Sequence, residues 1–217
     1  MSSIKLAALV GLVAVLSAVA NADTIVQVPT GSFSGATNQN QALSKVVVGG
    51  TNVVINTFGV YGQAQVAGNL KWVIFDAASP SAPVYVSPAQ AVAARPGTFA
   101  TMAQWYDSPE MSFTLLAGHT YAMGVMADKV GTGTFYWGNT YSAFGGGATV
   151  SGGGLSLPFM QALCNSGLSG GVLAGTPSLY TADNSNRYQM SLRIVPEPAT
   201  LGLLITGGIF ALRKRRA

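Results

Sequence analysis

Between residues 23 and 194, apolar residues recur at every second position or in short runs, and Gly, Pro, Asn and Ser interrupt them. No apolar stripe with helical spacing extends beyond two turns. Alternation with a period of two is typical of β-strands, whereas an amphipathic helix needs a period near 3.6. The sequence therefore predicts an all-β domain over residues 23–194, folded as a two-sheet, jelly-roll-like β-sandwich. The expected strands are 24–28, 45–48, 53–58, 70–76, 84–87, 101–106, 111–116, 120–127, 134–137, 155–160 and 187–194.

Three segments carry more specific expectations. Residues 187–194 alternate most clearly, so we expect one buried and one solvated face, and an outer strand at the end of the domain. Residues 70–75 are apolar on both faces after Lys71, which is typical of a central strand. Residues 111–116 and 120–127 are expected to form a β-hairpin, with Gly118 able to adopt positive φ in the turn.

The Gly-rich segment 143–154 reads AFGGGATVSGGG. Its glycines do not precede a strand-to-helix turn, and no Lys-Ser or Lys-Thr follows them, so it is not a phosphate-binding loop. We expect a flexible loop there.

The N-terminus has the plan of a secretory signal peptide. Lys5 precedes an uninterrupted small and apolar run over residues 6–20, and Ala20 and Ala22 supply the small residues that signal peptidase requires. We expect signal peptidase to remove residues 1–22. The alternative is an N-terminal anchor that is never cut.

The C-terminal segment 195–217 combines three features in order. Pro196, Glu197 and Pro198 come first, an apolar run follows over residues 199–212, and four cations end it. A helix over the run would be about 21 Å long, which makes it a marginal transmembrane helix against a core of about 30 Å. The four cations act as a stop-transfer signal and stay on the cytoplasmic side, which places the body outside the cytoplasmic membrane. These cations are Arg213, Lys214, Arg215 and Arg216.

This tail resembles a PEP-CTERM sorting signal, which occurs in exported proteins of Gram-negative bacteria that make exopolysaccharide. The resemblance implies that Pro196, Glu197 and Pro198 are recognised by exosortase, a membrane-embedded processing enzyme, and that the residues beyond them are removed. The protein would first be anchored in the inner membrane, with its body in the periplasm, and then reach the cell surface or extracellular matrix. The two prolines keep the motif extended and outside the helix that follows. An anchor that stays in place is the alternative.

The exported body is neutral, because six cations balance six acids between residues 23 and 195. A neutral body lacks the positive surface that nucleic-acid binding requires, so we expect no nucleic-acid partner. The single cysteine, Cys164, excludes an internal disulfide, and we expect it to be a small buried apolar side chain. The charged residues are Lys45, Lys71, Arg95, Lys129, Arg187 and Arg193, and Asp23, Asp76, Asp107, Glu110, Asp128 and Asp183.

Few residues of the body point to catalysis or to metal binding. His119 is the only histidine, lies in an expected turn, and has no nucleophile elbow to accompany it. Asp107 and Glu110 are the closest acids in sequence and could form the carboxylate pair of a glycosidase, although YDSPEM reads more simply as a turn. Residues 181–186 are rich in oxygen ligands, but one carboxylate there favours a hairpin turn over a calcium site. We expect neither metal nor cofactor.

Aromatic residues are the better candidates for a binding role. They gather in two stretches, residues 105–106 and residues 135–141. Neighbouring aromatics on a strand point to opposite faces, so each stretch is expected to have one ring in the core and another that stacks on a sugar. The alternative is that all of them belong to the core. The candidate glycan contacts are Trp105, Tyr136, Trp137 and Tyr141.

The sequence therefore predicts a non-enzymatic, exported envelope or matrix protein with a structural or adhesive role associated with exopolysaccharide. A carbohydrate-binding module that uses the surface aromatics is the alternative. A polysaccharide hydrolase is the third and least favoured hypothesis.

Overall fold

The computed structural model describes residues 24–28, 35–38, 40–128, 135–141, 149–158, 160–164, 168–173, 178–180 and 186–195. Nearly all of the secondary structure in these residues is antiparallel β-sheet, and one short helix, α2 (Phe99–Met102), accompanies it. The all-β prediction is confirmed. The expected signal peptide and C-terminal tail lie outside the described residues, and no helix within those residues is long and apolar enough to cross a membrane.

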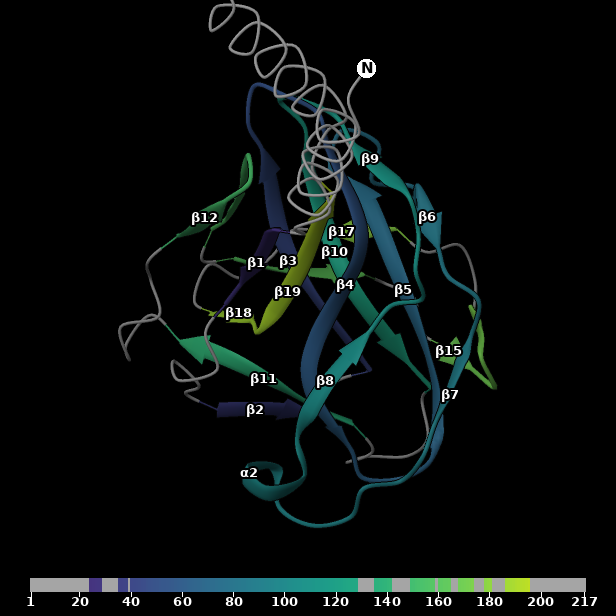
Figure 1. Cartoon of the computed structure of the whole chain (residues 1–217). Coiled ribbons are helices and arrows are strands. Elements are labelled where there is room, and N and C mark those ends of the chain that lie inside the picture. The colour runs from purple at the N-terminus through teal and green to yellow at the C-terminus, as the bar shows by residue number, and fades with distance from the viewer. Residues whose placement is uncertain are drawn as a thin grey trace, which may run out of the picture.

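The first sheet is built around the long strand β4 (Val53–Ala64), which pairs with four other strands (Figure 1). Strand β19 pairs with residues 54–60 of β4, and β11 pairs with residues 62–64. Strand β9 pairs with residues 53–55, and β8 pairs with residues 59–62. The other members of this sheet are β1 (Thr24–Gln27), β2 (Gly35–Asn38), β8 (Gln104–Asp107), β9 (Phe113–Leu115), β11 (Phe135–Tyr141), β18 (Asn186–Tyr188) and β19 (Met190–Val195).

The second sheet has β10 (Thr120–Ala127) at its centre, paired with β3 (Gln41–Val48) on one side and β5 (Gly68–Asp76) on the other. Its other strands are β6 (Tyr85–Val86), β7 (Gln90–Val92), β12 (Val150–Gly152), β13 (Leu155–Leu157), β14 (Gln161–Cys164) and β17 (Leu179–Tyr180). A separate two-stranded ribbon joins β15 (Leu168–Ser169) to β16 (Val172–Leu173).

One large core cluster takes side chains from both sheets, an arrangement consistent with a β-sandwich. The first sheet contributes Phe58, Val60 and Leu192, and the second contributes Trp72 and Met123. The apolar face of each sheet is therefore removed from water against the other sheet.

The second sheet is also covered on its opposite face. Val73, Phe75 and Met126 point away from the main core and pack with Cys164 and Leu168 in a smaller cluster. This explains why residues 70–75 are apolar on both faces, and it confirms that β5 is an interior strand with neighbours on both sides. Cys164 is buried, as expected.

Asp128 fixes this outer layer to the second sheet. Its carboxylate accepts hydrogen bonds from the backbone N–H and side-chain amide of Asn69, at 2.8 and 2.7 Å, and from the backbone N–H of Gly171, at 2.7 Å. Gly171 lies in the turn between β15 and β16 with φ of 75°. The buried acid thus joins β5 to this ribbon.

Two sequence expectations are wrong. The segments 111–116 and 120–127 do not form a hairpin, because β9 pairs with β4 in the first sheet whereas β10 belongs to the second. Gly118 does adopt positive φ, 74°, but the turn it forms connects the two sheets. Residues 101–106 are not one strand, because α2 occupies their beginning and β8 starts at Gln104.

The final strand differs from expectation in two ways. It is not an outer strand, because β19 lies between β1 and β4. It is also interrupted at Gln189, and the face expected to be solvated is buried at Arg187 and Gln189. The Arg187 guanidinium donates to the Leu157 carbonyl at 2.9 Å, and burial lowers the pKa of Arg187.

The Gly-rich segment is only partly a loop. Its second half forms a hairpin, in which β12 pairs with β13 through Gly153 and Gly154, at φ of 53° and 81°. Two consecutive positive φ angles suit a two-residue hairpin turn, and glycine adopts them without a steric penalty. Residues 143–148 lie outside the described part of the chain.

Candidate functional site

The outer face of the first sheet, opposite the core, carries a regular grid of side chains. In one row, Gln27 of β1 pairs with Ser191 of β19, Ser191 pairs with Gly59 of β4, and Gly59 pairs with Asp107 of β8. The residues that directly precede Gln27, Ser191 and Asp107 along their strands belong to the core; they are Val26, Met190 and Tyr106. Successive side chains on a strand point to opposite faces, so the row faces outward.

The rows on either side of this one differ in character. On one side, Ile25, Arg193 and Thr57 form the next row. On the other side, Tyr61 pairs directly with Trp105. A single sheet face therefore changes from a cationic and polar end to an aromatic end.

Gly59 creates a hollow in the middle of this face. A Cβ atom at this position would collide with Asp107 Oδ1 and would stand 3.0 Å from Ser191 Oγ and 3.1 Å from the Tyr106 carbonyl. Because Gly59 has no side chain, the Asp107 carboxylate lies over the β4 backbone. Asp107 in turn lines an open groove of about 170 Å³ on this face, which we call the outer groove. Its lining residues are Ile25, Gln27, Thr57, Trp105, Asp107, Ser191, Leu192 and Arg193.

Trp105, which lines the outer groove, belongs to an aromatic cluster that continues beyond the groove. The Tyr61 ring lies 5.5 Å from the Trp105 ring and 5.8 Å, edge to face, from the Phe99 ring of α2. Both distances are typical of favourable aromatic pairs. All three side chains are partly exposed, so the cluster offers ring surface to a ligand while its members hold one another in place.

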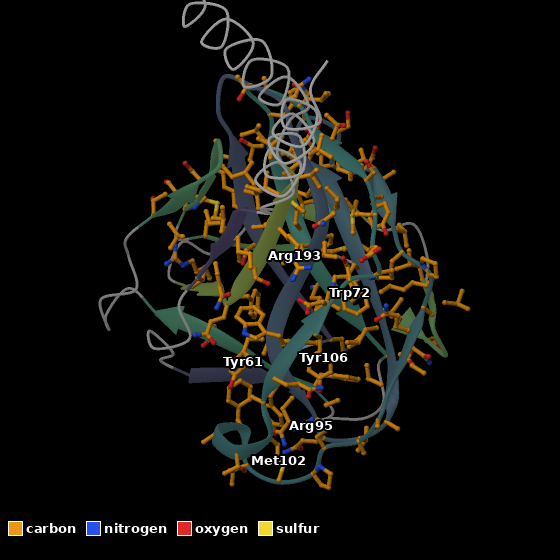
Figure 2. All side chains as sticks on the ribbon, in the orientation of Figure 1. Tyr61, Trp72, Arg95, Met102, Tyr106 and Arg193 are labelled. Carbon is orange, nitrogen blue, oxygen red and sulfur yellow. The ribbon has the colours of Figure 1, made fainter. Side chains whose placement is uncertain are left out.

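The segment before β8 positions this cluster. The Gln63 side chain donates to the carbonyls of Arg95 and Gly97, at 2.8 and 3.0 Å, which fastens the segment across β4. Arg95 in turn donates from Nε to the Met102 carbonyl at 3.0 Å and from Nη1 to Gln104. Figure 2 shows Arg95 and Met102 beside Tyr61 at one end of the molecule, with Arg193 farther along the sheet. The start of β8, and with it Trp105, is therefore tied to β4.

The polar groups of the outer groove include one negatively charged and one positively charged side chain. Asp107 is exposed, and its carboxylate accepts no hydrogen bond from the described residues. Arg193 is the cation of the groove, and Ser191, Thr57 and Gln27 add hydroxyl and amide groups. This combination of one aromatic ring surface with several hydrogen-bonding groups is suited to a hydroxyl-rich ligand that has an apolar face.

The aromatic residues predicted to contact a glycan lie in different places in the structure. Trp105 lines the outer groove. Tyr136 lies between the core residues Phe135 and Trp137, so it faces the outer side of the first sheet, partly exposed, but it does not line the groove. The side chain of Tyr141 lies outside the described part of the chain.

Trp137 cannot contact a glycan at the surface, and that prediction is wrong. It is 0% exposed, its ring stacks on Phe135 at 5.9 Å, and Tyr106 meets it edge to face at 6.3 Å. The ring also lies against Gly62, where a Cβ atom would collide with it. Trp137 is therefore a central part of the main core.

Sequence reasoning missed Tyr61 and Phe99. The strand over residues 53–58 was expected to end before Gly59, whereas β4 continues to Ala64. The alternation Phe58, Val60 inward and Tyr61 outward was the signal that could have extended it.

The structure does not assemble a carboxylate pair in the outer groove. Asp107 lines it and Glu110 does not, although both side chains are exposed. Ser108 continues the pairing with β4 instead of forming a turn: its N–H donates to the Phe58 carbonyl at 2.8 Å, and its hydroxyl accepts from the Phe58 N–H at 3.1 Å.

His119 is not simply a solvated turn residue. Its Nδ1 lies 2.7 Å from Asp76 Oδ2, and its ring stacks on Tyr121 at 6.0 Å. The pair joins the sheet-connecting turn to the end of β5. Within the described residues, no three His, Cys, Asp or Glu side chains gather as they would around a metal ion. The expected turn at 181–186 lies almost wholly outside those residues.

Comparison with protein-family models and with curated proteins finds no relative. No protein-family model matches the chain, and no curated protein matches it significantly. The expected sorting residues Pro196, Glu197 and Pro198, the cleavage residues Ala20 and Ala22, and the four terminal cations all lie outside the described part of the chain.

Proposed function

We propose that this chain is an exported envelope or matrix protein that adheres to exopolysaccharide through the outer groove. In this proposal the body is a jelly-roll-like β-sandwich between an N-terminal signal helix and a C-terminal transmembrane helix. A PEP-CTERM-type tail directs it, and exosortase processes it. Its role is structural and adhesive, not enzymatic.

The observation that carries the adhesive role is the position of Trp105. Trp105 lines a groove whose other lining residues supply hydroxyl, amide, carboxylate and guanidinium groups, together with the aliphatic side chains of Ile25 and Leu192. Sugars present apolar C–H faces to aromatic rings and hydroxyls to such polar groups, so one groove supplies both kinds of contact. The neutral charge of the body also suits a matrix of polysaccharide rather than nucleic acid.

The positions of the first and last strands support display from a membrane. Thr24 of β1 pairs with Ile194 of β19, so the two ends of the described body lie side by side. Ile194 also pairs with Ile55, and the six residue steps of β4 from Ile55 to Tyr61 span about 20 Å. A tether at either end would leave the aromatic end of this sheet face directed away from it.

The adhesive role is tested by binding of the exported full-length chain, in mild detergent, to exopolysaccharide purified from the source bacterium. We expect saturable binding that Trp105→Ala weakens at least about fivefold, since stacking of a nucleic-acid base on an aromatic ring, a comparable contact, is worth about 1–3 kcal/mol. Leu116→Ala is the matched control, because Leu116 is an exposed apolar residue outside the groove. Equal binding by both variants would exclude the outer groove as the adhesive site.

The sorting role has a separate test. Replacing Pro196, Glu197 and Pro198 together with alanine should leave the tail uncut, so intact mass spectrometry should find the unprocessed C-terminus in the membrane fraction. The same processed mass in wild type and variant would contradict recognition of this motif.

A further inference from the structure

One exposed acid lies beside the aromatic ring of the outer groove. Trp105 and Asp107 are two residues apart on β8, so both side chains leave the same face, with backbone positions about 7 Å apart. A sugar ring stacked on Trp105 would therefore place its substituents next to the Asp107 carboxylate.

The fold holds this carboxylate over the groove floor. Asp107 pairs with Gly59, and its Oδ1 occupies the space that a side chain at Gly59 would fill. The described residues donate no hydrogen bond to it, so its oxygens are available to accept from ligand hydroxyls.

The groove cation starts farther from Trp105 along the sheet than Asp107 does. Arg193 lies two strands across from β8 and one row along, which separates its backbone from that of Asp107 by about 12 Å. An anionic substituent near Trp105 would meet Asp107 first, and like charges a few ångströms apart repel.

We propose that the outer groove selects uncharged, hydroxyl-rich glycans over polyuronates, and that Asp107 is the residue that determines this specificity. The inference rests on the proposed function of the groove. The carboxylate contributes in two ways: it accepts hydrogen bonds from neutral sugar hydroxyls, and it repels sugar carboxylates at the same position.

The test uses the full-length chain in mild detergent and two sets of immobilised probes of matched length. One set contains uncharged glucan, mannan and galactan oligosaccharides, and the other contains oligogalacturonate. We expect the best uncharged probe to bind at least about tenfold more tightly than oligogalacturonate at low salt, since one such charge repulsion is worth roughly a factor of ten. Asp107→Asn should reduce this preference to within about threefold, by strengthening oligogalacturonate binding. Glu110→Gln, which removes a nearby exposed acid outside the groove, should leave the preference unchanged.

The outcomes separate this inference from the function on which it rests. Oligogalacturonate binding as tight as that of the uncharged probes, or a preference that Asp107→Asn leaves unchanged, would overturn the role of Asp107 and leave the adhesive groove standing. Absence of binding to every probe in both sets, or binding that Trp105→Ala does not weaken, would overturn the adhesive groove itself and this inference with it.

Discussion

Replacing Trp137 with alanine should destabilise the protein severely, whereas the same replacement at Trp105 should not. Trp137 is 0% exposed and contacts Phe135, Tyr106 and the backbone at Gly62. Truncation of a buried tryptophan costs about 3–5 kcal/mol. Gly62 has no side chain with which to fill the cavity, so we expect the upper half of this range.

Trp105 provides the matched comparison. It is partly exposed and contacts Tyr61 on the groove surface, so its replacement should lower the free energy of unfolding by about 1 kcal/mol, in keeping with one lost aromatic pair. For a body of this size, 1 kcal/mol corresponds to about 2–4 °C in Tm. The Trp137 variant should therefore melt roughly 8–20 °C below wild type, and the Trp105 variant only a few degrees below it.

Urea unfolding followed by far-ultraviolet circular dichroism measures both changes without depending on the fluorescence of the residues removed. If the Trp137 variant does not fold, Trp137→Phe should still fold with a smaller loss, because it keeps a ring against Gly62. A loss below about 1 kcal/mol for Trp137→Ala, or equal losses at the two tryptophans, would refute the assignment of one ring to the core and the other to the groove.

Three further changes test the groove, the outer layer and the second sheet. Gly59→Ala should displace the Asp107 carboxylate and reduce polysaccharide binding, and it should also lower the urea midpoint, because the new Cβ would stand 3.1 Å from the Tyr106 backbone carbonyl; a normal affinity would contradict this placement of Asp107. Asp128→Ala leaves three N–H groups of Asn69 and Gly171 without their acceptor and should cost about 2–4 kcal/mol. Hydrogen exchange of the Gly171 amide should become faster, and unchanged protection would argue against the Asp128 anchor. Burial raises the pKa of Tyr85, so the unfolded state ionises first and the free energy of unfolding should fall as pH rises above about 10. Urea midpoints at pH 9 and 11 should show a smaller fall for Tyr85→Phe, and equal falls would contradict this contribution.

Much of the second sheet could be predicted from the sequence. The bounds of β10 match the expected strand at 120–127, and β5 was expected as an interior strand. Both succeeded because strands covered on two faces are continuously apolar, a signal that does not depend on which strands are neighbours.

The pairing of strands was harder to predict, because the same local chemistry serves different connections. Gly118 adopts the positive φ expected of a hairpin turn, yet the turn connects two sheets. The alternation in residues 187–194 identified the core face at Met190 and Leu192, but it contains no information on whether the strand is central or at an edge. Long-range pairing decides both questions.

Part of the candidate site was not predicted because two glycines lie inside strand β4. The expected strand stopped at Phe58, but Gly59 and Gly62 both lie inside β4, where other side chains occupy the space next to them. Asp107 covers one, and Trp137 covers the other from the core side. Once β4 ended early in the prediction, Tyr61 could not be placed beside Trp105. Likewise, alternation separated Tyr136 from Trp137 correctly but did not say which of the two faced the core.

The most direct measurement of the adhesive groove is the tryptophan fluorescence of the full-length chain during titration with exopolysaccharide. The sequence contains three tryptophans, of which Trp72 and Trp137 are 1% and 0% exposed. An emission component accessible to iodide should therefore come from Trp105. We predict that polysaccharide shifts this component to shorter wavelength and protects it from iodide, and that Trp105→Ala abolishes the response. Saturable binding with the emission and quenching of Trp105 unchanged would contradict the account.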